Sequence, residues 1–161
     1  TGRTGEAAIC MADIVTEKTV VNGIIGLLAT GGSTNHTLHL VAMARAAGVL
    51  IDWDDFAELS HDIPLLARVY PNGSADVNHF HAAGGMGFLI GQLLSVGLLH
   101  ADVSTLLGEG LQRYATEPWL DQGQLAWRAA PAPPATLPAG HHAHRRRRNA
   151  ENATGRPCML P

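Results

Sequence analysis

The sequence predicts a mainly α-helical segment with one or two short strands and a disordered C-terminal tail. Three observations support this prediction: apolar stretches broken by glycine pairs, polar residues placed where helices can begin, and a change of composition after Trp127. Hydrophobic residues make up 46% of the chain and charged residues 16%. This balance is apolar for a soluble monomer, so much of the surface is expected to be covered by other protein. The chain of 161 residues is therefore interpreted as a fragment or a subunit.

Two helices are predicted on either side of a glycine pair. The stretch TVVNGIIGLLAT (19–30) is apolar on nearly every side, as is typical of a buried helix. Because it contains β-branched residues, a strand at its start stays an alternative. The glycines at 31–32 break this helix, and Ser33 or Thr34 can cap a second helix that runs to about Ala47.

Shorter elements are predicted further along the chain. The acids of DWDDF lie where a first helical turn favours them, so residues 52–60 are predicted to form a short surface helix. Residues 64–73, PLLARVYPNG, predict a strand or extended segment closed by a turn. From residue 76 the chain can turn helical and pause at a second glycine pair. An apolar helix over 86–96 follows, and then a turn and one more short helix over 97–114.

The formal net charge of −3 hides a split between body and tail. Residues 1–128 hold 6 Lys/Arg against 13 Asp/Glu, whereas residues 129–161 hold 5 Arg against one Glu. The body is therefore acidic and offers no basic surface for nucleic acid, so no nucleic-acid partner is expected.

Neither a membrane nor an oxidising compartment is indicated. The longest apolar run, 88–99, is shorter than the ~18 to 20 residues of a membrane span, and the first residues do not resemble a signal peptide. The two cysteines, Cys10 and Cys158, lack the spacing of a disulfide framework or a zinc site. We therefore expect a reduced, cytoplasmic setting.

The last part of the chain differs from the rest. Residues 129–161 are rich in Ala, Pro, His and Arg and cannot bury enough apolar surface to offset the entropy of ordering the chain, which predicts disorder from about Ala129. The run HHAHRRRR could bind metal or nucleic acid, but a segment without an evolved role is the favoured interpretation.

At VVNGIIGLLATGGSTNHTLHLVAMARAAG (20–48) the sequence resembles the dehydratase family that contains dihydroxy-acid dehydratase and 6-phosphogluconate dehydratase. The forms GGSTNH and YPNG are similar to the phosphogluconate branch. The resemblance covers residues 17–128 and implies the central part of an N-terminal domain in an α/β enzyme. Residues 1–16 would form an irregular lead-in, and residues 129–161 the low-complexity tail.

What the family implies is an iron–sulfur hydro-lyase that converts 6-phospho-D-gluconate to 2-keto-3-deoxy-6-phosphogluconate in the Entner–Doudoroff pathway. A 4Fe-4S cluster, Mg²⁺, a cytoplasmic location and a homodimer are implied for the parent enzyme. Two alternatives stay open. One is another sugar-acid or dihydroxy-acid dehydratase, and the other is a non-catalytic helical binding module whose basic tail contacts nucleic acid or an acidic partner.

The sequence also departs from this family. The cysteine motifs that hold the family's cluster lie upstream of GGSTN and are missing here, as is a later Thr-Asp-Gly-Arg run. No metal ligand and no catalytic base can be assigned, and we expect the chain to be inactive alone. Members of the family continue past LAWR with a folded region, so we hypothesise that the residues from about Ala129 arise from a frameshift.

The candidate substrate-binding residues are Ser33, Thr34, Asn35 and His36. The preceding glycines would let backbone amides approach an anion, and the hydroxyl and amide groups would add donors at the positive start of a helix. A phosphate or carboxylate of a sugar acid would suit such a site. The alternative is a plain junction between helices with Ser33 as the cap.

Other histidines and acids carry weaker signals. His36 and His39 share a helix face, although without a third ligand they are better explained by packing. His79 and His81 alternate as on a strand or loop and could line a pocket or an interface, joined by Asp76 and Asn78. The acids of DWDDF could chelate a hard cation, but a solvated helix start is favoured.

Overall fold

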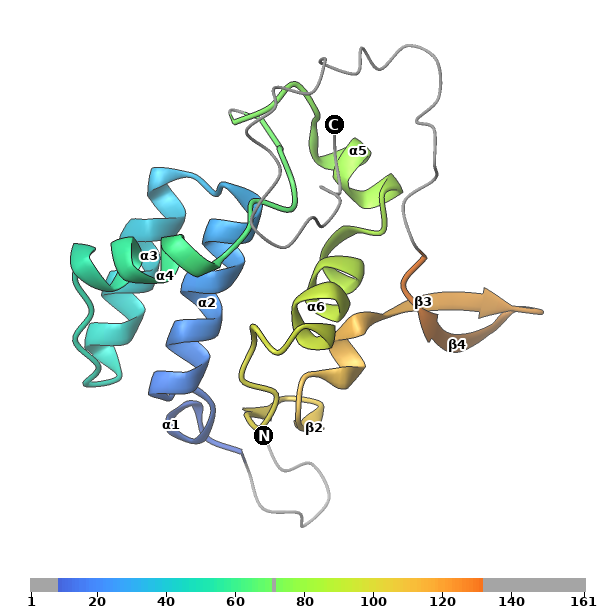
Figure 1. The fold of residues 1–161 in the computed structure, drawn as a ribbon. Coiled ribbons are helices and arrows are strands. Elements are labelled where there is room, and N and C mark those ends of the chain that lie inside the picture. The colour runs from blue at the N-terminus through green and yellow to red at the C-terminus, as the bar shows by residue number, and fades with distance from the viewer. Residues whose placement is uncertain (1–8, 71, 132–161) are drawn as a thin grey trace.

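The computed structural model describes residues 9–70 and 72–131 (Figure 1), so the predicted tail lies outside the described residues from 132 onward. The helices are α1 (Met11–Ile14), α2 (Glu17–Thr30), α3 (Thr34–Ala46), α4 (Trp53–Asp62), α5 (Val77–Ala82), α6 (Gly85–Ser95) and the 3-10 helix η1 (Gln112–Ala115). The strands are β1 (Ser104–Thr105), β2 (Gly108–Glu109), β3 (Thr116–Asp121) and β4 (Gln124–Ala129). The mainly helical class is confirmed. The α/β class of the larger parent enzyme stays a prediction, because both sheets described here are two-stranded and antiparallel.

The junction between α2 and α3 forms as the sequence predicts. α2 begins at Glu17, so the alternative of a strand at the start of 19–30 is wrong. The helix ends at Gly31, whose φ of 57° lies in the left-handed region that glycine adopts at little cost. The hydroxyl of Ser33 then caps α3 by accepting from the backbone N–H of His36 at 3.4 Å. This cap fixes the direction in which α3 leaves the glycine turn.

Acidic caps start the next two helices. Asp52 Oδ1 accepts from the amide of Asp54 at 2.9 Å at the start of α4, and Asp76 Oδ1 accepts from the amide of His79 at 3.0 Å at the start of α5. His79 and His81 therefore lie on a helix, and the strand or loop interpretation of these two residues is wrong. A single helical turn, α1, also lies within residues 1–16, where we expected an irregular lead-in.

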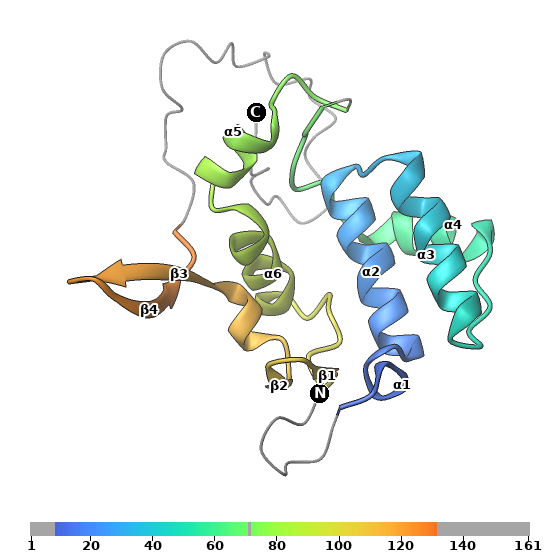
Figure 2. The same ribbon diagram turned by 180° about the vertical axis from the view of Figure 1, so that it is seen from behind.

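α2 is central to the fold, with α6 on one side and α3 and α4 on the other (Figures 1 and 2). Its faces are almost entirely apolar, which lets it supply both cores. One core packs Ile25 and Ala29 against Leu89 and Leu93 of α6 and the segment 63–67. The second packs other residues of α2 against α3 and α4; it consists of Ile24, Leu27, Leu40 and Phe56.

The chain between α4 and α5 is extended rather than a regular strand. The segment 64–73 makes one isolated bridge, in which Val69 pairs with Ala75. This outcome agrees with the extended alternative of the sequence prediction. The segment returns alongside the end of α2, because the amides of Leu66 and Ala67 both donate to the carbonyl of Ala29, at 2.8 and 3.0 Å.

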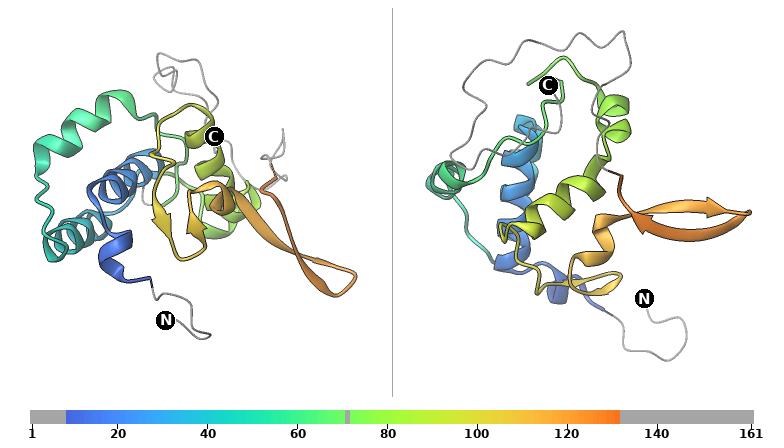
Figure 3. Two further views of the ribbon diagram at one scale, coloured as in Figure 1. Left: turned by 90° about the horizontal axis from the view of Figure 1, so that it is seen from below. Right: turned by 45° about the vertical axis from the view of Figure 1, so that its right-hand side comes forward.

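Over 97–114, where a turn and a short helix were expected, the structure has the short strands β1 and β2, and the only helix there is η1, which begins at Gln112. The β3–β4 hairpin was not predicted either. It projects away from the helices (Figure 3), and its turn is formed by Gln122 and Gly123, both with positive φ. Because side chains alternate between the two faces of a strand and paired residues share a face, the hairpin is amphipathic. One face carries the pairs Glu117↔Arg128, Trp119↔Ala126 and Asp121↔Gln124, and the other carries Pro118↔Trp127 and Leu120↔Leu125.

The polar face of the hairpin holds an ion pair and a cation–π contact, whereas the apolar face is open to solvent. Arg128 pairs with Glu117, with 2.6 Å between Nη2 and Oε1, and its guanidinium lies 3.7 Å from the centre of the Trp119 ring. On the opposite face, Leu120 is 70% exposed and Leu125 is 64% exposed. Part of the apolar surface that the composition led us to expect therefore lies on this hairpin.

Within residues 9–70 and 72–131, none of the helices combines the length and the apolar character that crossing a membrane requires.

Candidate functional site

The candidate site is the glycine turn that joins α2 to α3. The polypeptide folds back here so that Gly32 N–H donates to the carbonyl of Leu27 at 2.9 Å, and α3 starts immediately afterwards. Among the described residues, no acceptor lies within hydrogen-bond reach of the amides of Thr34 and Asn35, which are in the first turn of α3. Unpaired amides at the positive end of a 13-residue helix suit an anion.

The four predicted residues gather at this helix start. Ser33, Thr34 and Asn35 are exposed, and His36 is half-buried. The Nδ1 atom of His36 lies only 3.0 Å from where a Cβ on Gly32 would stand, so the imidazole folds back over the glycine turn. The side chains of these residues and the unpaired backbone N–H groups therefore all belong to the first turn of α3 and its cap. His39 is exposed further along α3 and does not join the turn.

A second segment reaches the same turn. The side-chain amide of Asn72 donates to the carbonyl of Gly31, although 41 residues separate them in sequence. Asn72 belongs to the YPNG stretch, so the two motifs most similar to the phosphogluconate branch, GGSTNH and YPNG, are in contact. The sequence analysis interpreted YPNG as a turn and as a family motif, but it did not place this motif beside GGSTNH. The side-chain amide of Asn72 is not needed to form the turn. This spare donor was the signal that could have indicated a second role for the YPNG motif.

The other candidate groups have structural explanations. His79 Nδ1 and Asp76 Oδ1 lie 2.8 Å apart at the start of α5. The hydrogen bond from the backbone N–H of His79 is the main cause that holds the pKa of Asp76 below its ordinary value of 3.8. Asp52 and Asp55 belong to the cap of α4, because Asp55 Oδ2 accepts from the amide of Asp52 at 2.8 Å. The acids of DWDDF therefore form a solvated helix start, as the sequence analysis favoured.

The described part of the chain does not fit an iron–sulfur cluster. A cluster needs several thiolate or imidazole ligands around one point. Cys10 is exposed at the start of α1, and among the described residues no three His, Cys, Asp or Glu side chains come together in a group that could hold a metal ion. Any cluster of the parent enzyme would need ligands from other parts of the protein.

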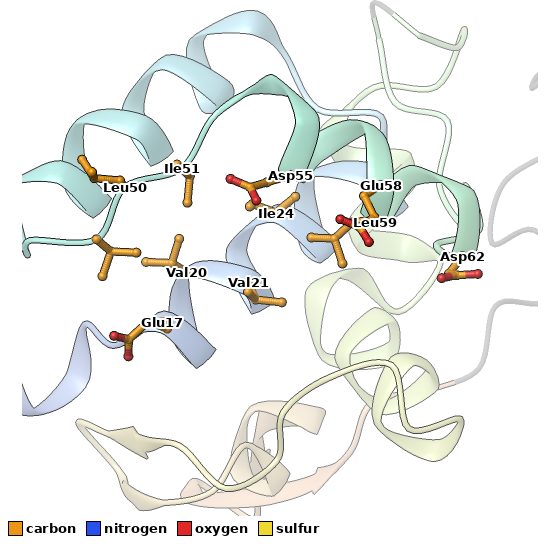
Figure 4. Close-up of a pocket in the computed structure, with 11 residues that line it drawn as sticks. Glu17, Val20, Val21, Ile24, Leu50, Ile51, Asp55, Glu58, Leu59 and Asp62 are labelled. Atoms are coloured by element: carbon orange, nitrogen blue, oxygen red, sulfur yellow. The ribbon is translucent and has the colours of Figure 1, made fainter.

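An apolar groove with acidic sides lies elsewhere, between α2, α4 and the loop 49–51 (Figure 4). Its volume is about 420 Å³, and none of the four predicted site residues lines it. The lining residues are Glu17, Val20, Val21, Ile24, Val49, Leu50, Ile51, Asp55, Glu58, Leu59 and Asp62.

The motifs, their contact and the helical fold indicate part of a dehydratase domain. Residues 3–114 match the model of the dihydroxy-acid/6-phosphogluconate dehydratase N-terminal family, and the chain belongs to this family. It is 64% identical over 121 residues to the phosphogluconate dehydratase of Pseudomonas aeruginosa and 65% identical over 115 residues to that of Escherichia coli K12. Identity to the chloroplastic dihydroxy-acid dehydratase of Arabidopsis thaliana is 38% over 113 residues.

The matches cover most of this chain and little of each relative. They take in 75%, 71% and 70% of the chain, but 20%, 19% and 19% of the Pseudomonas, Escherichia and Arabidopsis proteins. The chain therefore spans about a fifth of the length of the curated relatives it matches. The resemblance to the phosphogluconate branch is confirmed by the higher identity to the enzymes of that name.

Proposed function

We propose that this chain is a segment of a phosphogluconate dehydratase, the hydro-lyase that converts 6-phospho-D-gluconate to 2-keto-3-deoxy-6-phosphogluconate in the Entner–Doudoroff pathway. The observation that carries the proposal is the identity of 64–65% to two phosphogluconate dehydratases against 38% to a dihydroxy-acid dehydratase. We include in the proposal that the parent enzyme is a cytoplasmic homodimer with a 4Fe-4S cluster and Mg²⁺. Such a cluster supplies a Lewis acid for the departing hydroxyl group.

In this proposal, the glycine turn holds an anionic end of the sugar acid. The amides of Thr34 and Asn35 and the side chains of Ser33 and Asn35 donate hydrogen bonds to a phosphate or carboxylate oxygen, with His36 as a secondary donor. The exposed position of the first three residues and the presence of several donors at one helix start support this role. Binding an anion here also places negative charge at the positive end of α3, which is favourable.

The bond from Asn72 to Gly31 gives the turn its rigidity in this proposal. A donor set that is already in place loses less entropy when a ligand binds. The role of Asn72 is therefore positioning: it keeps the carbonyl of Gly31 turned away from the anion and the following amides directed outward.

Titration of the ¹⁵N-labelled chain with 6-phosphogluconate tests the binding role. The expected result is a saturable shift of the Thr34 and Asn35 amide signals. Gluconate, which keeps the carboxylate but lacks the phosphate, distinguishes the two anionic groups: a smaller shift assigns the phosphate to this turn, and an equal shift assigns the carboxylate. Shifts confined to other segments, or none at substrate concentrations up to the solubility limit, would overturn the assignment of this turn.

A separate assay tests whether the chain needs the rest of the enzyme. After anaerobic reconstitution with iron and sulfide, the chain is expected to hold no iron and to release no 2-keto-3-deoxy-6-phosphogluconate. Turnover together with bound iron would show that this chain holds a cluster by itself, and the inactivity proposed for it would then be wrong.

A further inference from the structure

The pairing of the β3–β4 hairpin shows which of its backbone groups point outward. Its turn has two residues, 122–123, so the pair Asp121↔Gln124 that closes the turn is hydrogen-bonded. Hydrogen-bonded and non-hydrogen-bonded pairs alternate along an antiparallel ladder. The next pair, Leu120↔Leu125, therefore directs its N–H and C=O groups away from the other strand of the hairpin, and so does every second pair after it.

On β4, the outward backbone groups belong to Leu125, Trp127 and Ala129, and we call this row the β4 edge. Among the described residues, none of these N–H and C=O groups has a backbone partner outside the hairpin. All three residues are exposed. Because the hairpin projects from the helices (Figure 3), another molecule can approach this edge.

The outer edge of β3 differs, because it is interrupted. Its outward positions are Thr116, Pro118 and Leu120, and proline has no N–H to donate. β4 has neither proline nor lysine, which commonly protect a free edge. The charged residue of β4, Arg128, is paired with Glu117 inside the hairpin. The hairpin therefore has one continuous edge that a further strand can extend.

A second copy of this chain fits the β4 edge in an antiparallel register. When Trp127 lies opposite Trp127 of the second copy, Leu125 lies opposite Ala129, and the outward groups of all three residues are paired. Arg128 then lies opposite Ala126, so no like charges face each other. The next register in one direction would oppose Arg128 to Arg128, which is unfavourable, and the next in the other direction would place Ala129 opposite the turn.

We propose that two copies of this chain associate through their β4 edges, in the register centred on Trp127. The product is a four-stranded antiparallel sheet, which is more stable than an isolated two-stranded hairpin. Paired residues share a face, so Leu125 and Trp127 of both copies lie together on one side of this sheet. The pairing depends on the backbone of β4 and not on the substrate of the parent enzyme.

The dimer is expected to be weak. Each copy contributes one strand of six residues, whereas a stable interface takes roughly 20 to 30 residues from each side. Backbone hydrogen bonds along the added strand supply the affinity, as in other cases of strand addition to a free edge. A dissociation constant between about 10 μM and 1 mM follows for a contact of this size.

Sedimentation equilibrium of the full chain tests for the dimer. Between about 10 μM and 1 mM, the mean mass is expected to rise from one chain of 17.0 kDa towards two. A single-chain mass at every concentration would overturn the proposal. Growth beyond two copies would also overturn it, because a two-fold contact between identical edges closes on itself.

Two matched proline variants locate the contact. Leu125→Pro and Leu120→Pro each remove one leucine from the same face and one outward N–H, and both leave the hydrogen bonds within the hairpin in place. They differ in the edge that they interrupt. Leu125→Pro is expected to weaken association at least about tenfold, and Leu120→Pro less than about threefold. Equal losses would assign the contact to the apolar face and contradict pairing through the β4 edge.

The register is tested in the unchanged chain, so this measurement does not depend on how the variants fold. In a mixture of ¹³C-labelled and unlabelled chains, an isotope-filtered NOE is expected between Hα of Ala126 in one copy and Hα of Arg128 in the other. These residues would form a non-hydrogen-bonded pair, with Cα atoms about 4.5 Å apart. Intermolecular NOEs confined to other segments, or none at a concentration where the dimer predominates, would overturn the proposal.

Discussion

The side chain of Asn22 pairs with the backbone of His100 in both directions. Its Nδ2 donates to the carbonyl of His100 at 2.9 Å, and its Oδ1 accepts from the amide of His100 at 2.9 Å. The neighbouring Lys18 donates to Asp102, and this hydrogen bond is the main cause that holds the pKa of Asp102 below its ordinary value of 3.8. The loop after α6 is therefore fastened to one face of α2 by residues about 80 positions apart.

Asn22→Leu is expected to destabilise the chain. The substitution removes both hydrogen bonds and leaves two backbone groups of His100 to water, which costs about 1 to 2 kcal/mol. Urea denaturation followed by circular dichroism measures the loss. Gln92→Ala, an exposed change on α6, serves as the control and is expected to stay within about 0.5 kcal/mol of the unchanged chain.

Two glycines of α2 are expected to respond oppositely to the same substitution. A Cβ on Gly26 meets nothing within 4 Å, so Gly26→Ala stabilises the helix by about 0.5 to 1 kcal/mol. A Cβ on Gly23 would lie 2.7 Å from Cδ2 of Leu40, so Gly23→Ala requires the Leu40 side chain to move. Because that side chain is buried in the core, the overpacking costs about 1 to 3 kcal/mol. Thermal unfolding of the two variants should rank Gly26→Ala above the unchanged chain and Gly23→Ala below it; the reverse order would contradict the α2–α3 packing.

Ser33 allows capping and anion binding to be separated. Ser33→Asp keeps a capping oxygen, so the stability of α3 is retained, but it places a negative charge where the anion is proposed to bind. Ser33→Ala removes the cap and is expected to cost about 1 kcal/mol. In the titration with 6-phosphogluconate, the aspartate variant should lose the Thr34 shift while its unfolding midpoint stays unchanged. Undiminished shifts in that variant would argue against anion binding at this helix start.

The start of α5 is expected to loosen in acid. The backbone hydrogen bond from His79 holds the pKa of Asp76 below 3.8, so the carboxylate cap stabilises α5 above that pH and is lost as the pH falls through the lowered pKa. Hydrogen exchange of the amides over 77–82 between pH 5 and pH 2 measures this change. Asp76→Asn, which caps without titrating, should give exchange that lacks the acid transition. An acid transition that persists in that variant would assign it to other groups.

Helix boundaries could be predicted where they depend on local chemistry. The Gly31–Gly32 turn, the Ser33 cap and the acidic start of α4 each follow from a few adjacent residues, and each was confirmed. Contacts between distant segments could not be predicted, because no periodicity in one stretch reports on another. The bond from Asn72 to Gly31 belongs to this class. The candidate site was therefore predicted from one motif, whereas the structure shows two motifs in contact.

The β3–β4 hairpin was missed for a different reason. Its turn places Gln122 at a φ of 48°, a conformation in which Asn or Gly is the usual signal, so DQGQ is a weak hairpin motif. The alternation of Trp119, Leu120 and Leu125 is also hard to recognise, because apolar residues stand on both faces. The face that carries Trp119 is nevertheless polar, because it also holds Glu117, Arg128, Asp121 and Gln124, and the guanidinium of Arg128 lies over the Trp119 ring.

The open apolar face of that hairpin bears on how long the chain would survive in a cell. Pro118, Leu120, Leu125 and Trp127 present to water the kind of surface that chaperones bind and proteases exploit when an enzyme is only partly synthesised. A chain that keeps this surface uncovered would be handled by the quality-control machinery as an unfinished protein even though its helices are correctly packed. Its abundance would then depend on the rate of degradation rather than on the stability of its core.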